Sequence, residues 1–169
     1  MGERDPATPS GSGRPTADPT RVVADADVLA ADLLVGGAAR EALDHVRSHA
    51  WLTLVASDPL LDDAEAVIAA IADPALAVDW RARIDETALT VGQTAGDHPA
   101  LASAYEGAAA HLLTFDEGLG SAQANLTLQD HLAVSVRTPD AFARLFDAAS
   151  LYEAEYEGDY PGPDRDPRA

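Results

Sequence analysis

Four aspartates lie where separate segments of the chain are expected to bring their ends together, and converging carboxylates are typical ligands of divalent metals. Asp25 follows an apolar run over 21–24, and Asp116 follows a second run over 111–115. In open parallel sheets, ligands bind beyond the carboxyl ends of the strands. The sequence therefore predicts a metal site at such an edge, with four candidate ligands: Asp25, Asp63, Asp97 and Asp116.

Two acids follow the first apolar run. Asp25 is expected to end a strand, and Asp27 to cap a helix that opens at Val28. The same Asp-x-Asp pattern opens the haloacid-dehalogenase-like phosphatases, where the first Asp is the nucleophile and the second the general acid. That class usually has Gly at the next position and a later Lys, whereas this chain has Val28 and no lysine. The phosphatase interpretation is therefore kept as a minor alternative.

The other two acids stand at helix starts. Asp63 follows the capped start Ser57-Asp58-Pro59 and is expected at the edge of the apolar helix face, with Asp62 and Glu65 turned more nearly to water. Asp97 precedes His98-Pro99 and an alanine-rich helix. Because the helix dipole and capping both favour acids at these places, each one taken alone is equally well explained as structural.

Taken in order, these segments resemble the PIN-domain family of metal-dependent ribonucleases, and a haloarchaeal branch of it most closely. The shared pattern is an apolar strand ending in Asp25, a Ser-x-Pro helix start with an acid, an Asp opening an alanine-rich helix, and a strand ending in Thr114-x-Asp116. The segment Val136-Arg137-Thr138-Pro139-Asp140-Ala141-Phe142 is similar to the family's closing strand and helix.

The resemblance implies a fold, an activity and a cofactor. It implies that Asp25, Asp63, Asp97 and Asp116 coordinate Mg²⁺ or Mn²⁺, that Thr114 orients substrate or a ligand, and that the substrate is RNA. Asp25 and Asp116 would be the primary ligands, and the metals would activate a water for in-line attack on a phosphodiester. Small PIN proteins often serve as toxins, so an antitoxin and a second copy of the chain are candidate partners.

A non-catalytic PIN-like binding or scaffold module is the main alternative. Asp63 stands where the family usually has the longer Glu, which favours this alternative. The retention of acids at all four positions favours a metal site, because clustered carboxylates repel one another unless a cation compensates. His45 and His49 have metal-ligand spacing on one helix, but without a third ligand they are interpreted as ordinary histidines.

The composition has 29 acidic residues against 11 basic ones, all arginine, and a net charge of −18. Acid excess without lysine is typical of proteins adapted to molar intracellular salt, as in haloarchaea, where screening weakens the repulsion between carboxylates. The usual basic surface of a nucleic-acid-binding protein is therefore not expected. The absence of cysteine, of a membrane-length apolar segment and of a signal core predicts a cytoplasmic protein.

Between two expected disordered tails, 1–19 and 153–169, one domain is predicted over 20–152. Strand-like and helix-like runs alternate there, which predicts a three-layer α/β/α fold around a parallel sheet of four or five strands. Strands are expected at 21–25, 52–56, 87–91, 111–115 and 133–136. Helices are expected at 27–35, 38–49, 59–71, 74–86, 99–109, 117–124 and 139–147, several with Pro in the first turn.

Overall fold

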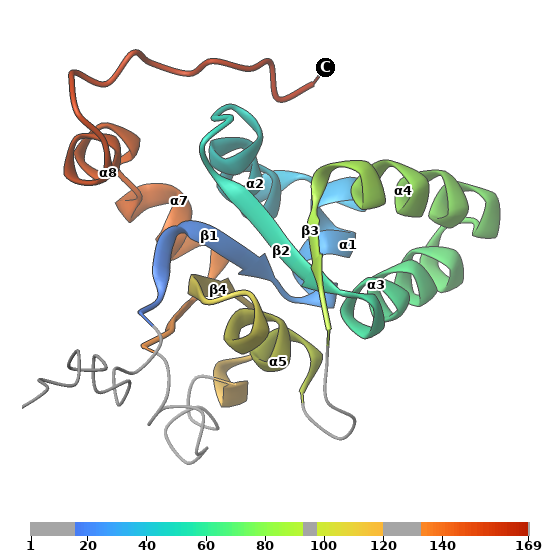
Figure 1. Cartoon of the computed structure of the whole chain (residues 1–169). Coiled ribbons are helices and arrows are strands. Elements are labelled where there is room, and N and C mark those ends of the chain that lie inside the picture. Colours follow the sequence, from blue (N-terminus) through green and yellow to red (C-terminus); the bar gives the residue numbers. More distant parts are fainter. Residues whose placement is uncertain (1–15, 93–97, 120–132, 169) are drawn as a thin grey trace, which may run out of the picture.

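Five short strands form one parallel sheet in the order β3-β2-β1-β4-β5. The computed structural model describes residues 16–92, 98–119 and 133–168 (Figure 1). All pairings between neighbouring strands are parallel, and β1 lies at the centre with Val22 and Val23 fully buried. The strands are β1 (Asp18–Ala24), β2 (Thr53–Ser57), β3 (Leu89–Val91), β4 (Ala109–Leu113) and β5 (Ser135–Arg137).

The helices begin at the residues that the capping pattern indicates. Ser57, Asp73, His98 and Thr138 each accept a hydrogen bond from the first turn of a helix that carries Pro at its start. Residues 117–119 are helical, and the rest of the helix predicted at 117–124 lies outside the described residues. The helices are α1 (Ala26–Leu34), α2 (Gly37–Arg47), α3 (Asp58–Ile71), α4 (Pro74–Thr87), α5 (Pro99–Glu106), α7 (Pro139–Leu145) and α8 (Ala148–Glu155).

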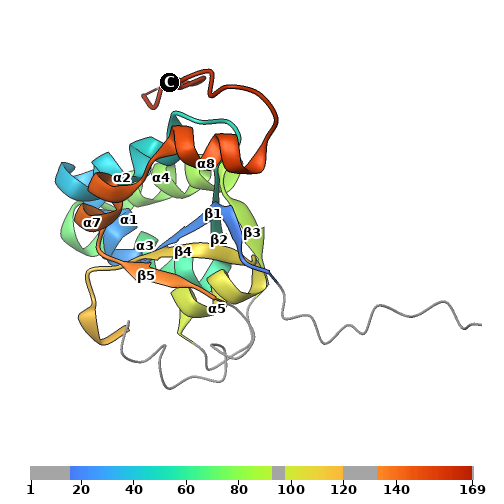
Figure 2. The ribbon, with the colours of Figure 1, turned by 90° about the vertical axis from the view of Figure 1, so that its left-hand side faces the viewer.

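Helices cover both faces of the sheet, so the predicted α/β/α architecture is confirmed. Helices α1, α2, α3 and α7 lie on one side and α5 on the other (Figure 2). Helix α5 packs closely on β2. At Gly107, the C-cap residue of α5, an added Cβ would lie only 2.3 Å from Cγ1 of Val55. In the described part of the chain, no helix combines the length and apolarity needed to cross a membrane.

The helices next to β1 and β4 in the chain lie on opposite faces of the sheet. Helix α1 follows β1 on one face, whereas α5 precedes β4 on the opposite face (Figure 2). In an open parallel sheet, such a change of face leaves a crevice outside the carboxyl ends of the two strands, and this is the usual place for a ligand. Asp25 and Thr114, the residues that directly follow β1 and β4, therefore occupy the switch point of this fold.

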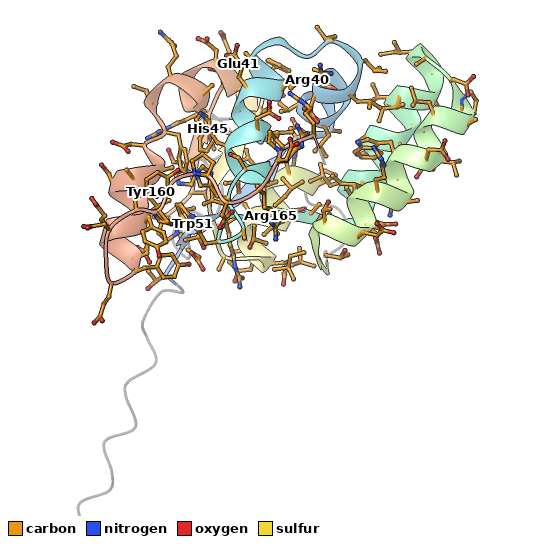
Figure 3. The ribbon with its side chains drawn as sticks, turned by 90° about the horizontal axis from the view of Figure 1, so that it is seen from above. Arg40, Glu41, His45, Trp51, Tyr160 and Arg165 are labelled. Carbon is orange, nitrogen blue, oxygen red and sulfur yellow. The ribbon has the colours of Figure 1, made fainter. Side chains whose placement is uncertain are left out.

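The prediction that 153–169 form a disordered tail is wrong for residues 153–168, which the structure describes. Residues 148–155 form α8, and the following segment runs back across the molecule past α2 (Figure 3). Tyr152, Tyr156 and Tyr160 are spaced four residues apart and pack with Trp51 and His49. Aromatic packing of this kind offsets the entropy of ordering the segment, although its acidic composition favours disorder.

Polar bonds fix the same segment to the turn between α2 and β2. Asp164 accepts a hydrogen bond from the backbone N–H of Ala50 at 2.7 Å and donates its own N–H to the carbonyl of Ser48 at 2.9 Å. Nε2 of the buried His49 meets the hydroxyl of Tyr160, and Arg168 pairs with Asp44 at 2.6 Å. At the other end of the chain, β1 already includes Asp18, while 1–15 lie outside the described residues.

Candidate functional site

The centre of the candidate site is a hydrogen bond between the ends of β1 and β4. The hydroxyl of Thr114 donates to Oδ2 of Asp25 at 2.8 Å and accepts from the backbone N–H of Asp116 at 3.0 Å. Thr114 is buried and Asp25 is partly exposed. One hydroxyl therefore fixes the orientation of the Asp25 carboxylate and the course of the chain at Asp116.

Asp25 has a second role as the N-cap of α1. Its Oδ1 accepts the N–H of Ala26 at 2.8 Å, and the helix begins at Ala26. The expectation that Asp27 caps a helix opening at Val28 is therefore wrong, because Asp25 takes the capping position and Asp27 lies exposed in the first turn. A carboxylate with one hydrogen bond on each oxygen still has lone pairs available for a ligand.

Asp116 is exposed and starts the next helical turn. Its Oδ1 accepts the N–H of Gly118 at 2.8 Å. Its backbone is held by Thr114, as described above, so the side chain is anchored close to the end of β4. Asp116 thus combines a capping role with a position next to the Asp25–Thr114 pair.

Backbone bonds tie three strand ends together around these residues. The N–H of Asp25 donates to the carbonyl of Leu113 at 2.8 Å, and the N–H of Thr114 donates to the carbonyl of Arg137 at 3.0 Å. A pocket of about 230 Å³ opens at the ends of β4 and β5. Its lining consists of Thr114, Asp116, Glu117, Val136, Arg137 and Thr138.

Asp63 does not form a three-acid group with Asp25 and Asp116 in the described residues. It lies exposed on α3, beside the buried Leu60 and Leu61. The neighbouring Asp62 is held in an ion-pair cluster on Arg81, at 2.6 Å, together with Asp58, Glu65 and Asp85. Burial lowers the pKa of Arg81, but the hydrogen bonds and charges of Asp62 and Asp85 raise it above its ordinary value. Asp62 and Glu65 thus join α3 to α4, and Asp62 remains exposed as expected.

The structure describes only three of the four predicted acids: Asp25, Asp63 and Asp116. Asp97 lies outside the described residues. Across residues 16–92, 98–119 and 133–168, no three His, Asp or Glu side chains form a group that can hold a metal ion. The structure joins Asp25 to the backbone of Asp116 through Thr114, and Asp63 does not complete a three-acid group with them.

Arg137 is a residue of this region that the sequence analysis did not single out. It ends β5, lines the pocket and is partly buried. On the neighbouring strand, Nδ1 of His111 is buried and has no hydrogen-bond partner within the described residues. Burial, followed by the charge of Arg137, lowers the pKa of His111 below its ordinary value. The sequence offers one signal that could have identified Arg137 as a candidate site residue: an arginine directly after an expected strand.

The two spaced histidines have structural roles, as expected. Nε2 of His45 lies 3.2 Å from the carbonyl of Ala143, and its ring packs against Phe142 and Phe146. His49 is buried, with Nδ1 lying 2.6 Å from the carbonyl of His45. Each ring is already engaged with α7 or with the C-terminal segment.

Comparison with protein-family models finds a family for this chain. A family model described as a family of unknown function (DUF7384) matches residues 16–168. Neither the curated proteins nor the solved structures contain a match. The match includes α8 and the C-terminal segment, which agrees with their packing on the rest of the domain.

Proposed function

The chain belongs to DUF7384, a family of unknown function, and we propose from its own residues that it is a divalent-metal-dependent ribonuclease. The observation that carries the proposal is the Thr114 hydroxyl bond to Asp25 at the switch point of the sheet. It places one oriented carboxylate beside Asp116 and next to a pocket. This is the position where parallel α/β sheets bind ligands.

The residues present fit Mg²⁺ or Mn²⁺. Mg²⁺ is commonly held by one or two carboxylates, with waters and substrate phosphates completing its shell. Asp25 and Asp116 supply two carboxylates, and no sulfur or paired imidazole ligand of a softer metal accompanies them in the described residues. Asp63 and Asp97 stay as the further ligands that the PIN resemblance implies.

When bound, the metal ion supplies Lewis-acid stabilisation of the phosphodiester and lowers the pKa of a water. The chain itself orients the groups. Thr114 holds the Asp25 carboxylate at a fixed angle, and the N-terminal turn of α1 lies directly behind it. Asp116 and Glu117 line the pocket and would be the carboxylates that accept a proton from a water there, while Asp25 is bonded to the pocket residue Thr114.

The test uses Asp25→Asn, because Asn also serves well as an N-cap and α1 should keep its start. The measurements are made in KCl that keeps the protein folded. Mn²⁺ should raise the melting temperature of the wild type. At a Mn²⁺ concentration of roughly 100 times Kd, the free energy of unfolding should increase by about 2.7 kcal/mol. Asp25→Asn should lose both this gain and the cleavage of an RNA panel.

Asp79→Asn is the matched control, since Asp79 is exposed on α4 and the substitution removes the same charge. It should behave as the wild type. If Mn²⁺ stabilises wild type and Asp25→Asn equally, the metal site is wrong, and a non-catalytic binding or scaffold module becomes the better interpretation.

A further inference from the structure

Arg137 differs from the other arginines of this acidic chain. Most of the described arginines bond to a carboxylate or a carbonyl, and within the described residues Arg137, Arg83 and Arg165 have no such partner for their guanidinium groups. Arg83 and Arg165 are exposed, whereas Arg137 is partly buried and lines the pocket. A cation that is partly removed from water, with no counter-ion among the described residues, favours binding of an anion.

Neutral polar groups surround Arg137 on the side of β4 and in the pocket. His111 lies on β4 two residues before Leu113, the partner of Arg137, and pairs with Ser135 on β5. Burial and, after it, the charge of Arg137 on the neighbouring strand lower the pKa of His111. Thr138 adds a hydroxyl group to the lining of the same pocket, whereas the Thr114 hydroxyl proton is already donated to Asp25. Hydroxyl groups are common ligands of phosphate oxygens, and the planar guanidinium is well suited to a phosphate.

An exposed aromatic residue lies in the chain between two residues that line the pocket. Phe115 lies in the chain between Thr114 and Asp116, which both line the pocket, and 48% of its surface is exposed. A phenylalanine at the end of a buried strand normally packs inward, because burial of its ring is favourable. An aromatic face beside a phosphate site is a platform for stacking of a nucleobase.

We propose that Arg137 binds a phosphate of the substrate strand and that Phe115 stacks on an adjoining base. The inference rests on the proposed nuclease function. Asp116 and Glu117 line the same pocket and repel a phosphate, so phosphate binding at Arg137 should require the divalent cation that Asp25 and Asp116 are proposed to hold. Arg137 and Phe115 are thus positioning residues for the strand that is cut.

The first test is the kinetics of cleavage of an unstructured oligouridylate by the full chain. Arg137→Gln should raise KM about tenfold, which corresponds to the loss of one charge-assisted phosphate contact. The stabilisation by Mn²⁺ should be unchanged. The control is Arg83→Gln. Arg83 is exposed on α4 and is remote in the sequence from the residues that line the pocket, so this variant should leave KM unchanged.

The second test separates stacking from packing. Phe115→Leu should raise KM about tenfold, and Phe115→Trp should restore it, since stacking depends on an aromatic face. A substrate with an abasic site at the stacked position should raise the KM of the wild type by the same factor of about ten. The same substrate should not raise the KM of Phe115→Leu any further. If Phe115→Leu weakens intact and abasic substrates to the same extent, the ring does not stack on a base.

The third test does not depend on cleavage. Uridine 5′-monophosphate with Mg²⁺ should raise the pKa of His111, followed by NMR, because an anion that neutralises Arg137 removes one cause of the lowered pKa. The pKa should not respond in Arg137→Gln.

The two proposals fail in different ways. If the wild type cuts RNA and Arg137→Gln matches Arg83→Gln in KM, the role of Arg137 is overturned and the nuclease function stands. If the wild type cuts nothing, a His111 response to uridine 5′-monophosphate that requires Arg137 still supports the phosphate site. No response overturns that site as well.

Discussion

Thr114 and Asp25 lie 89 residues apart in the sequence, and a 2.8 Å hydrogen bond joins their side chains. The Thr114 hydroxyl donates this bond and accepts another from Asp116, so its orientation is determined from both sides. Because Thr114 is buried, water cannot easily replace either partner. The bond therefore holds β1 and β4 in one relative position at the candidate site.

Thr114→Val should lower the free energy of unfolding by about 2 kcal/mol, because it removes a hydrogen bond to a charged acceptor and leaves the Asp116 N–H without its partner. The measurement is denaturant unfolding in molar KCl. Thr90→Val, on the exposed part of β3, changes the same atoms and should be nearly neutral. Equal stabilities of the two variants would contradict the structural role of the bond.

Gly107→Ala should destabilise the domain by about 1–3 kcal/mol, because the new methyl group would overlap Cγ1 of Val55 and β2 or α5 would have to move. Gly92→Ala is the control, since an added Cβ there meets no atom within 4 Å. Thermal unfolding compares the two. A neutral Gly107→Ala would show that α5 packs less closely on the sheet.

The C-terminal segment should contribute to stability. Tyr160→Phe should lower the free energy of unfolding by about 1–3 kcal/mol, because Nε2 of the buried His49 loses its partner. Tyr156→Phe removes a hydroxyl from the same aromatic cluster, where the ring is 43% exposed, and should change little. Deletion of 156–169 should lower the melting temperature more than Tyr160→Phe does; an unchanged value would show that the segment is not docked.

His111 should make stability depend on pH. Burial and the charge of Arg137 lower its pKa below the ordinary value of 6.5. The unfolded state therefore binds the proton first, and the contribution of neutral His111 is complete above pH about 6.5 and is lost as the pH falls toward the lowered pKa. Arg137→Gln should raise the pKa measured by NMR and reduce this loss. An unchanged pKa would contradict the proximity of the two groups.

Salt should stabilise the fold, because a net charge of −18 repels itself strongly in dilute buffer and weakly at molar ionic strength. We expect cooperative unfolding when KCl is lowered well below 1 M, followed by circular dichroism. Arg81→Gln should shift the transition to higher KCl, since Asp58, Asp62, Glu65 and Asp85 would then face one another without their shared cation. A melting temperature independent of KCl would exclude adaptation to salt.

The sequence predicted the helices that have a strong local signal. A capping residue followed by Pro marks the start of α3, α4, α5 and α7, and all four are observed. Helix α8 and the segment after it were missed, because their order depends on the rings of Trp51 and His49, which are remote in the sequence. Local composition carries no information about such a distant surface.

The candidate site was predictable where strand ends define it. Asp25, Thr114 and Asp116 follow apolar runs, and the parallel sheet brings them together. Asp63 lies exposed beside the buried Ala64, at the edge of the apolar face as predicted, but the pattern of one helix does not determine which strand end its edge residues approach. Arg137 became a candidate only when its lack of a partner in the described residues was visible.

The central place of β1 also determines when the site can form during folding. Val22 pairs with Leu54 on one side and with His111 on the other. The second pairing closes a much longer loop, and contacts between remote residues form slowly. The Asp25 amide, which bonds to Leu113, therefore becomes protected only when the whole sheet has assembled. Its exchange with solvent deuterium should report global unfolding, and no intermediate that lacks β4 can possess the site.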